Sequence, residues 1–236
     1  MSRRNKLAKF AQLLSFPNVY ENFDDGDAQL SGKDGEQCNL KGNWASGHFG
    51  NDKPIVLELA CGRGEYCLAL ARKFPDKNFI GVDIKGARIW KGAKIALEEG
   101  LDNVAFIRTR IEQLTQFIGA NEISEIWITF PDPFLRKPNR RLTAPPFLDR
   151  YRQMLQANAV VHLKTDSPEL YEYTLLSVER YPHATLQYED DDIYAKDLPI
   201  PELVYKTYYE KMHLAVGKTI KYIRFGLQAL DPVEDQ

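Results

Sequence analysis

Cysteine and histidine are scarce in this chain of 236 residues, and their spacing excludes two kinds of site. The three cysteines, Cys38, Cys61 and Cys67, cannot all pair with one another, and none of them has the spacing of a metal-binding motif. The four histidines are scattered along the chain. We therefore expect reduced thiols in a cytoplasmic protein, with no metal site.

Long apolar runs and a strong net charge are also missing. Lys9 and Gln12 interrupt the first apolar stretch, which excludes a signal peptide or membrane span there, and we expect no membrane partner. The formal net charge of −2 does not indicate a nucleic-acid-binding protein. Basic residues nevertheless cluster at Arg3, Arg4, Lys6 and Lys9, and again at Arg136, Lys137, Arg140 and Arg141. Such clusters can steer a polyanion, although an ordinary solvated surface has the same pattern.

The apolar pattern changes at Pro54, where short apolar runs begin to alternate with helical patterns. The expected strands are residues 55–59, 78–82, 104–107, 126–130 and 160–163, and the expected helices are one that ends near residue 74, one over 86–99 and one over 147–155. This alternation predicts βαβ crossovers, and therefore an α/β, doubly wound and mostly parallel sheet covered on both faces. Thr219–Leu227 alternates like a late strand at or near the sheet edge.

The first 53 residues have a different composition from the rest. Residues 1–23 indicate a basic, partly helical arm, and residues 24–53 carry six of the 15 glycines together with Asp, Asn and Ser. That mixture favours a flexible connection over packed core. We expect residues 54–230 to form one α/β domain, with 1–53 as an N-terminal arm and flexible segment and 231–236 as a tail.

A glycine-containing turn follows the first expected strand, in the sequence Glu58-Leu59-Ala60-Cys61-Gly62-Arg63-Gly64. Gly62 and Gly64 permit a tight turn and let a ligand approach the backbone, and the N–H groups of the next helix favour a carboxylate. Asp83 ends the second expected strand, where it can accept hydrogen bonds from a ribose diol. Because ligands bind at this edge of a doubly wound sheet, we expect the cofactor here.

The same turn is compatible with a dinucleotide, and the neighbouring residues weigh against it. A dinucleotide fingerprint has a third glycine at the position of Cys67. Binding of a pyrophosphate does not need the carboxylate of Glu58, whereas this carboxylate compensates the positive charge of a ligand with an ammonium and a sulfonium. The turn therefore favours S-adenosylmethionine, with a nucleotide or a purely structural turn as the alternatives.

A proline-flanked carboxylate ends the fourth expected strand, in Phe130-Pro131-Asp132-Pro133-Phe134. The two prolines fix φ on either side of Asp132 and withhold two backbone donors, which stiffens this residue. A turn that only closes a strand is the alternative for the tripeptide by itself. The basic run Arg136-Lys137-Pro138-Asn139-Arg140-Arg141 follows directly, and a rigid carboxylate beside four cations suits a base held next to its phosphates.

Together these motifs resemble the bacterial tRNA (guanine-N7)-methyltransferases, over about residues 44–226. The resemblance rests on Trp44…Phe49-Gly50-Asn51, residues 57–65, 79–84, 129–134 and 140–143, Lys164-Thr165-Asp166, and Thr207-Tyr208-Tyr209-Glu210 ahead of Gly217. The proline-flanked aspartate, the basic run and the late Thr-x-x-Glu form the specific combination. The family implies a Rossmann-like class I methyltransferase with a seven-stranded sheet, S-adenosylmethionine as cofactor and tRNA as partner.

The resemblance also implies a role for each matching position. Glu58, Gly62, Gly64, Asp83, Arg110 and Asp132 would contact the cofactor, and Asp132 would be the central catalytic carboxylate. Arg136, Asp166, Thr207 and Glu210 match positions that shape the guanosine pocket. Arg3, Arg4, Lys137, Arg140 and Arg141 would contact the RNA backbone. The family suggests guanosine 46 of the variable loop as the target.

Three positions depart from the family pattern, and the basic run is shorter. Arg110 stands where an acidic residue is usual, Phe134 replaces a tryptophan, and Arg136 replaces a lysine, which keeps the charge and changes the geometry. Two other functions therefore stay open: a methyltransferase for another RNA base, a protein or a small molecule, and a non-catalytic RNA-binding or scaffold protein. The convergent carboxylates argue against the scaffold, since a site without catalysis has no need of them.

Overall fold

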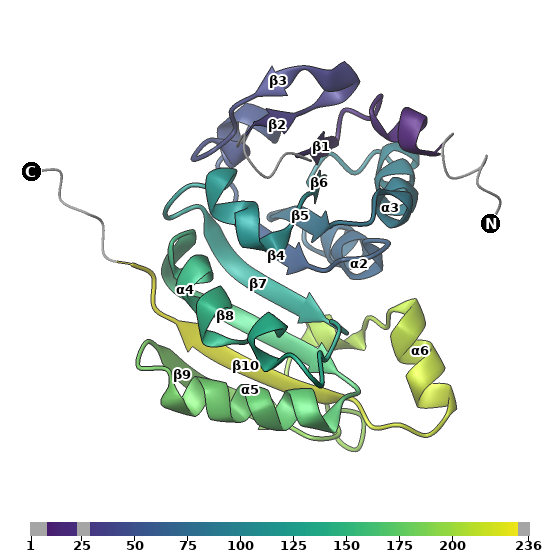
Figure 1. The fold of residues 1–236 in the computed structure, drawn as a ribbon. Helices are drawn as coiled ribbons and strands as arrows, with labels where there is room; N and C mark the ends of the chain where they lie inside the picture. The colour runs from purple at the N-terminus through teal and green to yellow at the C-terminus, as the bar shows by residue number, and fades with distance from the viewer. Residues whose placement is uncertain (1–8, 23–28, 231–236) are drawn as a thin grey trace, which may run out of the picture. The chain divides into compact units, whose positions relative to one another are not determined.

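The computed structural model describes residues 9–22 and 29–230 (Figure 1). These residues form two compact units, of which the first ends at Gly119 and the second begins at Ala120. Each unit combines strands with helices. The predicted α/β class is therefore present in both units.

The first unit is built on a mostly parallel set of strands. Its elements are β1 (Val19–Glu21), β2 (Leu30–Ser31), η1 (Lys33–Gly35), β3 (Gln37–Cys38), η2 (Trp44–His48), β4 (Ile55–Leu59), α2 (Glu65–Lys73), β5 (Asn78–Asp83), α3 (Gly86–Glu98), β6 (Val104–Arg108) and η3 (Ile111–Gln116). The spatial order is β3-β2-β1-β6-β5-β4, in which β4, β5, β6 and β1 are parallel and β2 and β3 are antiparallel additions. Every residue of β4 and β5 is buried, as parallel strands covered on both faces require.

Phe106 on β6 organises the packing of α2 and α3 against these strands. Its side chain is fully buried, and three glycines border it. A Cβ added to the backbone would lie 2.5 Å from its ring at Gly64, 2.8 Å at Gly81 and 3.0 Å at Gly92. The missing side chains therefore let both helices approach the sheet closely.

Residues 29–53 carry regular structure where their glycine content favours a flexible connection. They include β2, β3 and two short helices. Trp44 is fully buried, and its Nε1 donates a hydrogen bond of 2.8 Å to the carbonyl oxygen of Phe117. The sequence also places residues 19–21 outside the domain, whereas β1 pairs with β6. Composition does not reveal these contacts, because they join residues that are far apart in the chain.

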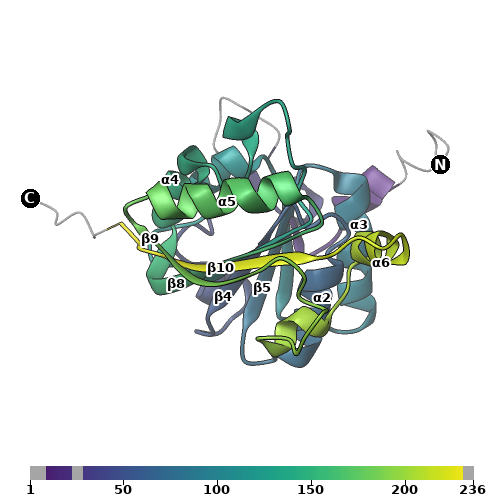
Figure 2. The same ribbon diagram turned by 90° about the horizontal axis from the view of Figure 1, so that it is seen from below.

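The second unit has four strands among its described residues. Its elements are β7 (Ile123–Thr129), η4 (Pro138–Arg140), α4 (Pro145–Arg152), β8 (Leu155–Thr165), α5 (Pro168–Arg180), β9 (Ala184–Asp190), η5 (Pro201–Val204), α6 (Tyr208–Ala215) and β10 (Lys221–Leu227). The order is β7-β8-β10-β9, with β7 parallel to β8 and β10 antiparallel to both of its neighbours. Figure 2 shows α5 along one face of these strands, and α5 packs on β8, β9 and β10.

A stack of three rings fixes the centre of this unit. Trp127 and His162 lie face to face with 4.0 Å between their centroids, and His162 Nδ1 is 2.7 Å from the hydroxyl of Tyr222. The three residues come from β7, β8 and β10, so that one stack ties adjacent strands together. Burial lowers the pKa of His162, which keeps the imidazole neutral inside the stack.

The predicted doubly wound, mostly parallel fold is confirmed. Among the described residues, seven strands (β4 to β10) lie in the region expected as the methyltransferase domain. The late strand expected at or near the sheet edge is β10, which pairs with the edge strand β9. One detail differs from the prediction. The helix expected over residues 147–155 ends at Arg152, because Leu155 already begins β8.

Candidate active site

The turn between β4 and α2 is built from backbone that few residue types adopt. Ala60, Gly62 and Gly64 have φ angles of 55°, 57° and 65°, in the left-handed region that glycine enters without steric cost. Gly64 is the N-cap of α2. A Cβ added at Gly62 would meet nothing within 4 Å. The turn is therefore tight, and it leaves open space over Gly62 for the approach of a ligand.

Two buried carboxylates flank this turn. Asp83, at the end of β5, accepts hydrogen bonds from the backbone N–H of Gly62 (2.9 Å) and of Lys85 (2.7 Å). Glu58 on β4 accepts a hydrogen bond of 2.9 Å from the backbone N–H of Cys67. The two side chains are 7% and 3% exposed. The structure thus brings together Glu58, Gly62, Gly64 and Asp83, as the sequence predicts.

The local charge of the turn is negative. Burial raises the pKa of the Cys61 thiol well above its ordinary value, and the nearby charges of Glu58 and Asp83 raise it further. The thiol therefore stays neutral beside two carboxylates. A ligand that carries an ammonium and a sulfonium would compensate these charges, and the oxygens of Asp83 can accept ribose hydroxyls in addition to backbone N–H groups. The residues present fit S-adenosylmethionine.

Arg110 differs from the other predicted cofactor residues. It is exposed, directly after β6, and it is the N-cap residue of η3. Its carbonyl oxygen accepts a hydrogen bond of 2.9 Å from the backbone N–H of Gln113. The backbone carbonyl is thus engaged within η3, and the structure gives no carboxylate at this position for an adenine amino group.

The loop after β7 holds Asp132 in a constrained conformation. Phe130 and Phe134 have φ angles of 49° and 40°, which are strained for residues with a side chain. The backbone N–H of Phe134 donates to Asp132 Oδ1 at 3.2 Å, and that of Phe130 donates to the carbonyl oxygen of Lys164 at 2.8 Å. Asp132 itself is exposed. This loop therefore presents a fixed, accessible carboxylate at the carboxyl end of β7.

The basic run after this loop divides into two groups. Arg136, Lys137 and Arg140 are exposed, as a contact with RNA requires. Arg141 is only 7% exposed, and its Nε donates a hydrogen bond of 2.9 Å to the carbonyl oxygen of Pro133. The predicted RNA contact of Arg141 is thus inconsistent with its burial, which places its guanidinium under the Asp132 loop. Arg3 and Arg4 lie outside the described residues.

Asp166 follows the end of β8 and is surrounded by basic side chains. Its Oδ2 lies 2.5 Å from Lys218 Nζ and 3.3 Å from His213 Nδ1. The ring of His213 stacks on Phe130, with 6.0 Å between the centroids. Asp166 is therefore joined through His213 to the residue that begins the Asp132 loop.

Thr207 and Glu210 form a capping box at the start of α6. Thr207 Oγ1 accepts from the backbone N–H of Glu210, and Glu210 Oε2 accepts from that of Thr207, each at 3.2 Å. Glu210 is completely buried, and its Oε1 lies 2.7 Å from Lys164 Nζ. The predicted pocket residue Glu210 thus has structural partners for both oxygens, so any effect on a guanosine would come through the position of α6.

Lys164 and Tyr194 are the partners of Glu210 that the sequence prediction did not single out. The hydroxyl of Tyr194 donates to Glu210 Oε1 at 2.5 Å. Lys164 lies in an apolar strand, where a lysine is rarely buried without a partner. The position of this lysine in an apolar strand could have indicated a buried ion pair. The sequence could not identify Glu210 as the partner, because the two residues are 46 positions apart.

Two classes of site find no support in the described part of the chain. Within residues 9–22 and 29–230 no group of three or more His, Cys, Asp or Glu side chains could hold a metal ion. None of the helices in these ranges has the length and apolar character needed to cross a membrane.

Comparison with known proteins places these motifs in a family. The family model described as "Putative methyltransferase" matches residues 52–223. A protein of Christiangramia forsetii is 48% identical over 97% of this chain and all of its own length, and one of Bacteroides thetaiotaomicron is 47% identical over 95% of this chain and 86% of its own. One of Porphyromonas gingivalis is 52% identical over 80% and 77%. All three are named tRNA (guanine-N(7)-)-methyltransferase.

Solved structures with low sequence identity share the fold. The 16S rRNA methyltransferase KamB has a TM-score of 0.60 at 13% identity, covering 82% of this chain and 96% of its own. A SAM dependent methyltransferase from Aquifex aeolicus has a TM-score of 0.52, also at 13% identity, covering 76% and 85%. At this identity the likeness shows the fold alone, whereas the family model and the relatives cover most of the chain. The chain belongs to the tRNA (guanine-N(7)-)-methyltransferase family.

Proposed function

We propose that this protein transfers a methyl group from S-adenosylmethionine to N7 of a guanine in tRNA. The observation that carries the proposal is the tight turn after β4, in which Asp83 binds the N–H of Gly62 and Glu58 lies buried beside it. The names of the relatives that are 47% to 52% identical agree with it. The cofactor would bind at this turn, and Asp132 would act on the base that accepts the methyl group.

The cofactor would be held by the residues of the first unit. Asp83 would accept the ribose hydroxyls, Glu58 would compensate the positive charge of the amino-acid end, and the open space over Gly62 would admit the ligand to the backbone. When bound, S-adenosylmethionine would supply a methyl group by in-line displacement: the lone pair of N7 forms the new N–C bond as the S–C bond breaks, and the S–C electron pair stays on sulfur, which leaves as the neutral thioether S-adenosylhomocysteine. Arg110 would contribute through its backbone, since its side chain cannot accept a hydrogen bond.

Asp132 would act on the guanine through its charge. Guanine N7 carries a lone pair in the plane of the base, so no proton has to leave before attack, and the product base is cationic. Asp132 would accept hydrogen bonds from the N–H groups of the guanine edge and stabilise the positive charge as it develops. Because the loop already fixes this carboxylate, little reorganisation is needed, and positioning of this kind can contribute roughly 7–11 kcal/mol in favourable cases.

Further residues would bind the target guanosine and the RNA backbone. Arg136, Asp166 and Thr207 would shape the guanosine pocket, with Glu210 holding the start of α6. The target would be guanosine 46 of the variable loop, because RNA loops offer bases that can be splayed out and read on several edges. Lys137 and Arg140 would contact the backbone. Since tRNA is the substrate, we place the protein in the cytoplasm.

The test is methyl transfer from labelled S-adenosylmethionine to unmodified tRNA, followed by nucleoside analysis of the product. Formation of 7-methylguanosine is expected, and sequencing of the product would map the position. Cofactor binding without any methylation of tRNA would assign the enzyme to another substrate. Binding of RNA without cofactor affinity would instead support the scaffold function.

A further inference from the structure

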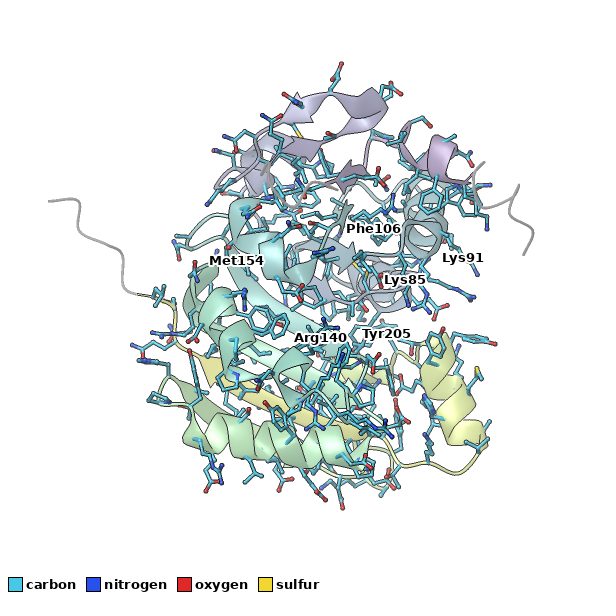
Figure 3. The ribbon with its side chains drawn as sticks, viewed as in Figure 1. Lys85, Lys91, Phe106, Arg140, Met154 and Tyr205 are labelled. Atoms are coloured by element: carbon cyan, nitrogen blue, oxygen red, sulfur yellow. The ribbon has the colours of Figure 1, made fainter. Side chains whose placement is uncertain are left out.

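The charged side chains of α3 are basic over most of its length. Lys85 precedes the helix as its N-cap, and Arg88, Lys91 and Lys94 follow on its outer face. Residues 85–97 contain no aspartate or glutamate. The opposite face is buried and consists of Gly86, Ile89, Gly92, Ala93 and Ala96. Figure 3 shows Lys91 on the side of α3 away from the strands.

The side chain of Trp90 on α3 contacts a further lysine, Lys9. Trp90 Nε1 donates a hydrogen bond of 2.9 Å to Gln12 Oε1. Lys9 Nζ lies 4.3 Å from the centroid of the Trp90 ring, and Lys94 Nζ lies 5.4 Å from it. Both contacts are cation–π interactions. The helical residues 9–13 are therefore held against α3, and together Lys9, Lys85, Arg88, Lys91 and Lys94 form what we term the α3 basic surface.

Helix stability does not account for this arrangement. The positive end of a helix dipole favours acidic residues in the first turn and basic residues in the last. The helix α2 follows this rule, with Glu65 in its first turn and Lys73 in its last. The order is reversed in α3, which has no acidic residue in its first turn and ends in Glu98. Its cations therefore add to the positive potential of the helix N-terminus.

The chemistry that such a surface recognises is a row of anionic groups. Lys85 and Lys91 are exposed, and Lys94 has an ion pair with Glu98 at 3.4 Å, which solvent weakens. The half-buried ring of Trp90 adds a planar aromatic group to this surface. Repeated cations beside an aromatic ring suit a sugar–phosphate backbone.

We propose that the α3 basic surface binds the RNA backbone of the substrate and positions tRNA on the first unit. This inference rests on the proposed function. It adds a second contact region to the exposed residues of the basic run, Arg136, Lys137 and Arg140, which belong to the second unit. When both regions bind, each unit contacts the RNA backbone.

The experiment compares the variant Lys91→Gln/Lys94→Gln with the wild-type protein. As matched control, Lys41→Gln/Lys73→Gln removes the same charge from two exposed lysines of the same unit that lie off α3. Binding of unmodified tRNA is measured over a series of KCl concentrations, together with KM for tRNA, kcat and the Kd for S-adenosylmethionine. Thermal unfolding confirms that both variants are folded.

We expect Lys91→Gln/Lys94→Gln to bind tRNA roughly tenfold more weakly. The slope of log K against log salt concentration should be shallower by about 1.4 to 1.8, because each lost phosphate contact removes about 0.7 to 0.9 from it. KM for tRNA rises, while kcat and cofactor affinity match the control. Equal salt dependence in variant and control would overturn the inference and leave the proposed function intact. Absence of tRNA binding and methylation by the wild-type protein would overturn both.

Discussion

Lys164 Nζ lies 2.7 Å from Glu210 Oε1, and both side chains are completely buried. Lys164 also donates to the carbonyl oxygen of Tyr205 at 3.0 Å, so the lysine of β8 holds the segment that leads into α6. Burial lowers the pKa of Lys164 to about 8, against the opposing effect of the Glu210 charge. Because Asp166 lies two residues beyond Lys164, this ion pair ties the predicted guanosine pocket to the centre of the unit.

Loss of one partner of this pair should destabilise the protein strongly. Lys164→Met leaves the carboxylate of Glu210 buried without its counter-charge, and we expect a loss of about 3–5 kcal/mol in the free energy of unfolding. The double variant Lys164→Met/Glu210→Gln should recover part of this loss, because glutamine is neutral and still completes a capping box. Urea unfolding measures both values. A single variant within 1 kcal/mol of the wild type, on the scale of an exposed pair, would contradict a structural role for the pair.

Asp132→Asn should reduce turnover far more than cofactor binding. The amide keeps the shape of the side chain and removes the charge that we propose stabilises the cationic product, so kcat should fall by roughly 10²–10³ while the Kd for S-adenosylmethionine stays within a few-fold. Steady-state methyl transfer and calorimetric titration provide the two numbers. Asp197→Asn, which removes an exposed carboxylate from the same unit, serves as the control. Near-normal turnover of Asp132→Asn would disprove this role.

Glu58→Gln should show the opposite behaviour. The glutamine oxygen can still accept the hydrogen bond from Cys67 N–H, whereas the negative charge is gone. Hydrogen bonds to charged groups contribute about 1.5–3 kcal/mol, so cofactor affinity should fall roughly ten- to hundredfold. Titration with S-adenosylmethionine and thermal unfolding separate loss of affinity from loss of structure. If the Kd does not change, the charge of Glu58 does not serve the cofactor.

The parts of the fold and site that sequence predicts well are those set by short-range patterns. The strands β4 and β5 are continuous apolar runs, and the turn with Gly62 follows β4 within three residues, so both could be read directly. Asp83 could be placed because parallel strands bring their carboxyl ends to one edge. For the same reason the Asp132 loop was expected at the end of β7.

The parts that sequence does not predict depend on contacts between distant residues. Residues 29–53 are ordered by contacts such as that of Trp44 with Phe117. Arg141 has the charge of an RNA contact, and only its hydrogen bond to Pro133 reveals that it supports a loop. Glu210 belongs to a motif that implies substrate binding, while its burial depends on Lys164. A motif thus identifies which residues matter more reliably than how they act.

His48 should make stability depend on pH in the mildly acid range. Its Nδ1 lies 2.6 Å from the hydroxyl of Tyr20, and burial lowers the pKa of the imidazole to about 4. The unfolded chain, with a pKa near 6.5, then binds more protons than the folded one between pH 6.5 and 4. The stabilisation is therefore complete above pH 6.5 and falls as the pH drops towards 4, by at most about 3 kcal/mol.

The check on His48 is urea unfolding of the wild type and of His48→Gln from pH 7 to 4. Glutamine keeps a hydrogen-bond acceptor for Tyr20 and does not titrate. Other groups titrate equally in both proteins, so the difference between the two curves isolates the histidine. A constant difference over this range would show that His48 keeps an ordinary pKa.

Gly81 and Gly92 should respond differently to the same added methyl group, because their neighbours differ in mobility. A Cβ at Gly81 would lie 2.8 Å from Phe106 Cδ1, whereas at Gly92 it would overlap the backbone oxygen of Arg63. Gly81→Ala should cost about 1–3 kcal/mol through overpacking, and Phe106→Leu in the same chain should remove part of that cost. Gly92→Ala should keep most of its cost in the Phe106→Leu background, since the closer contact, 2.4 Å, is with the Arg63 carbonyl oxygen, which a side-chain change does not move. Double-mutant cycles from urea unfolding test this, and equal coupling at the two glycines would contradict the packing described for Phe106.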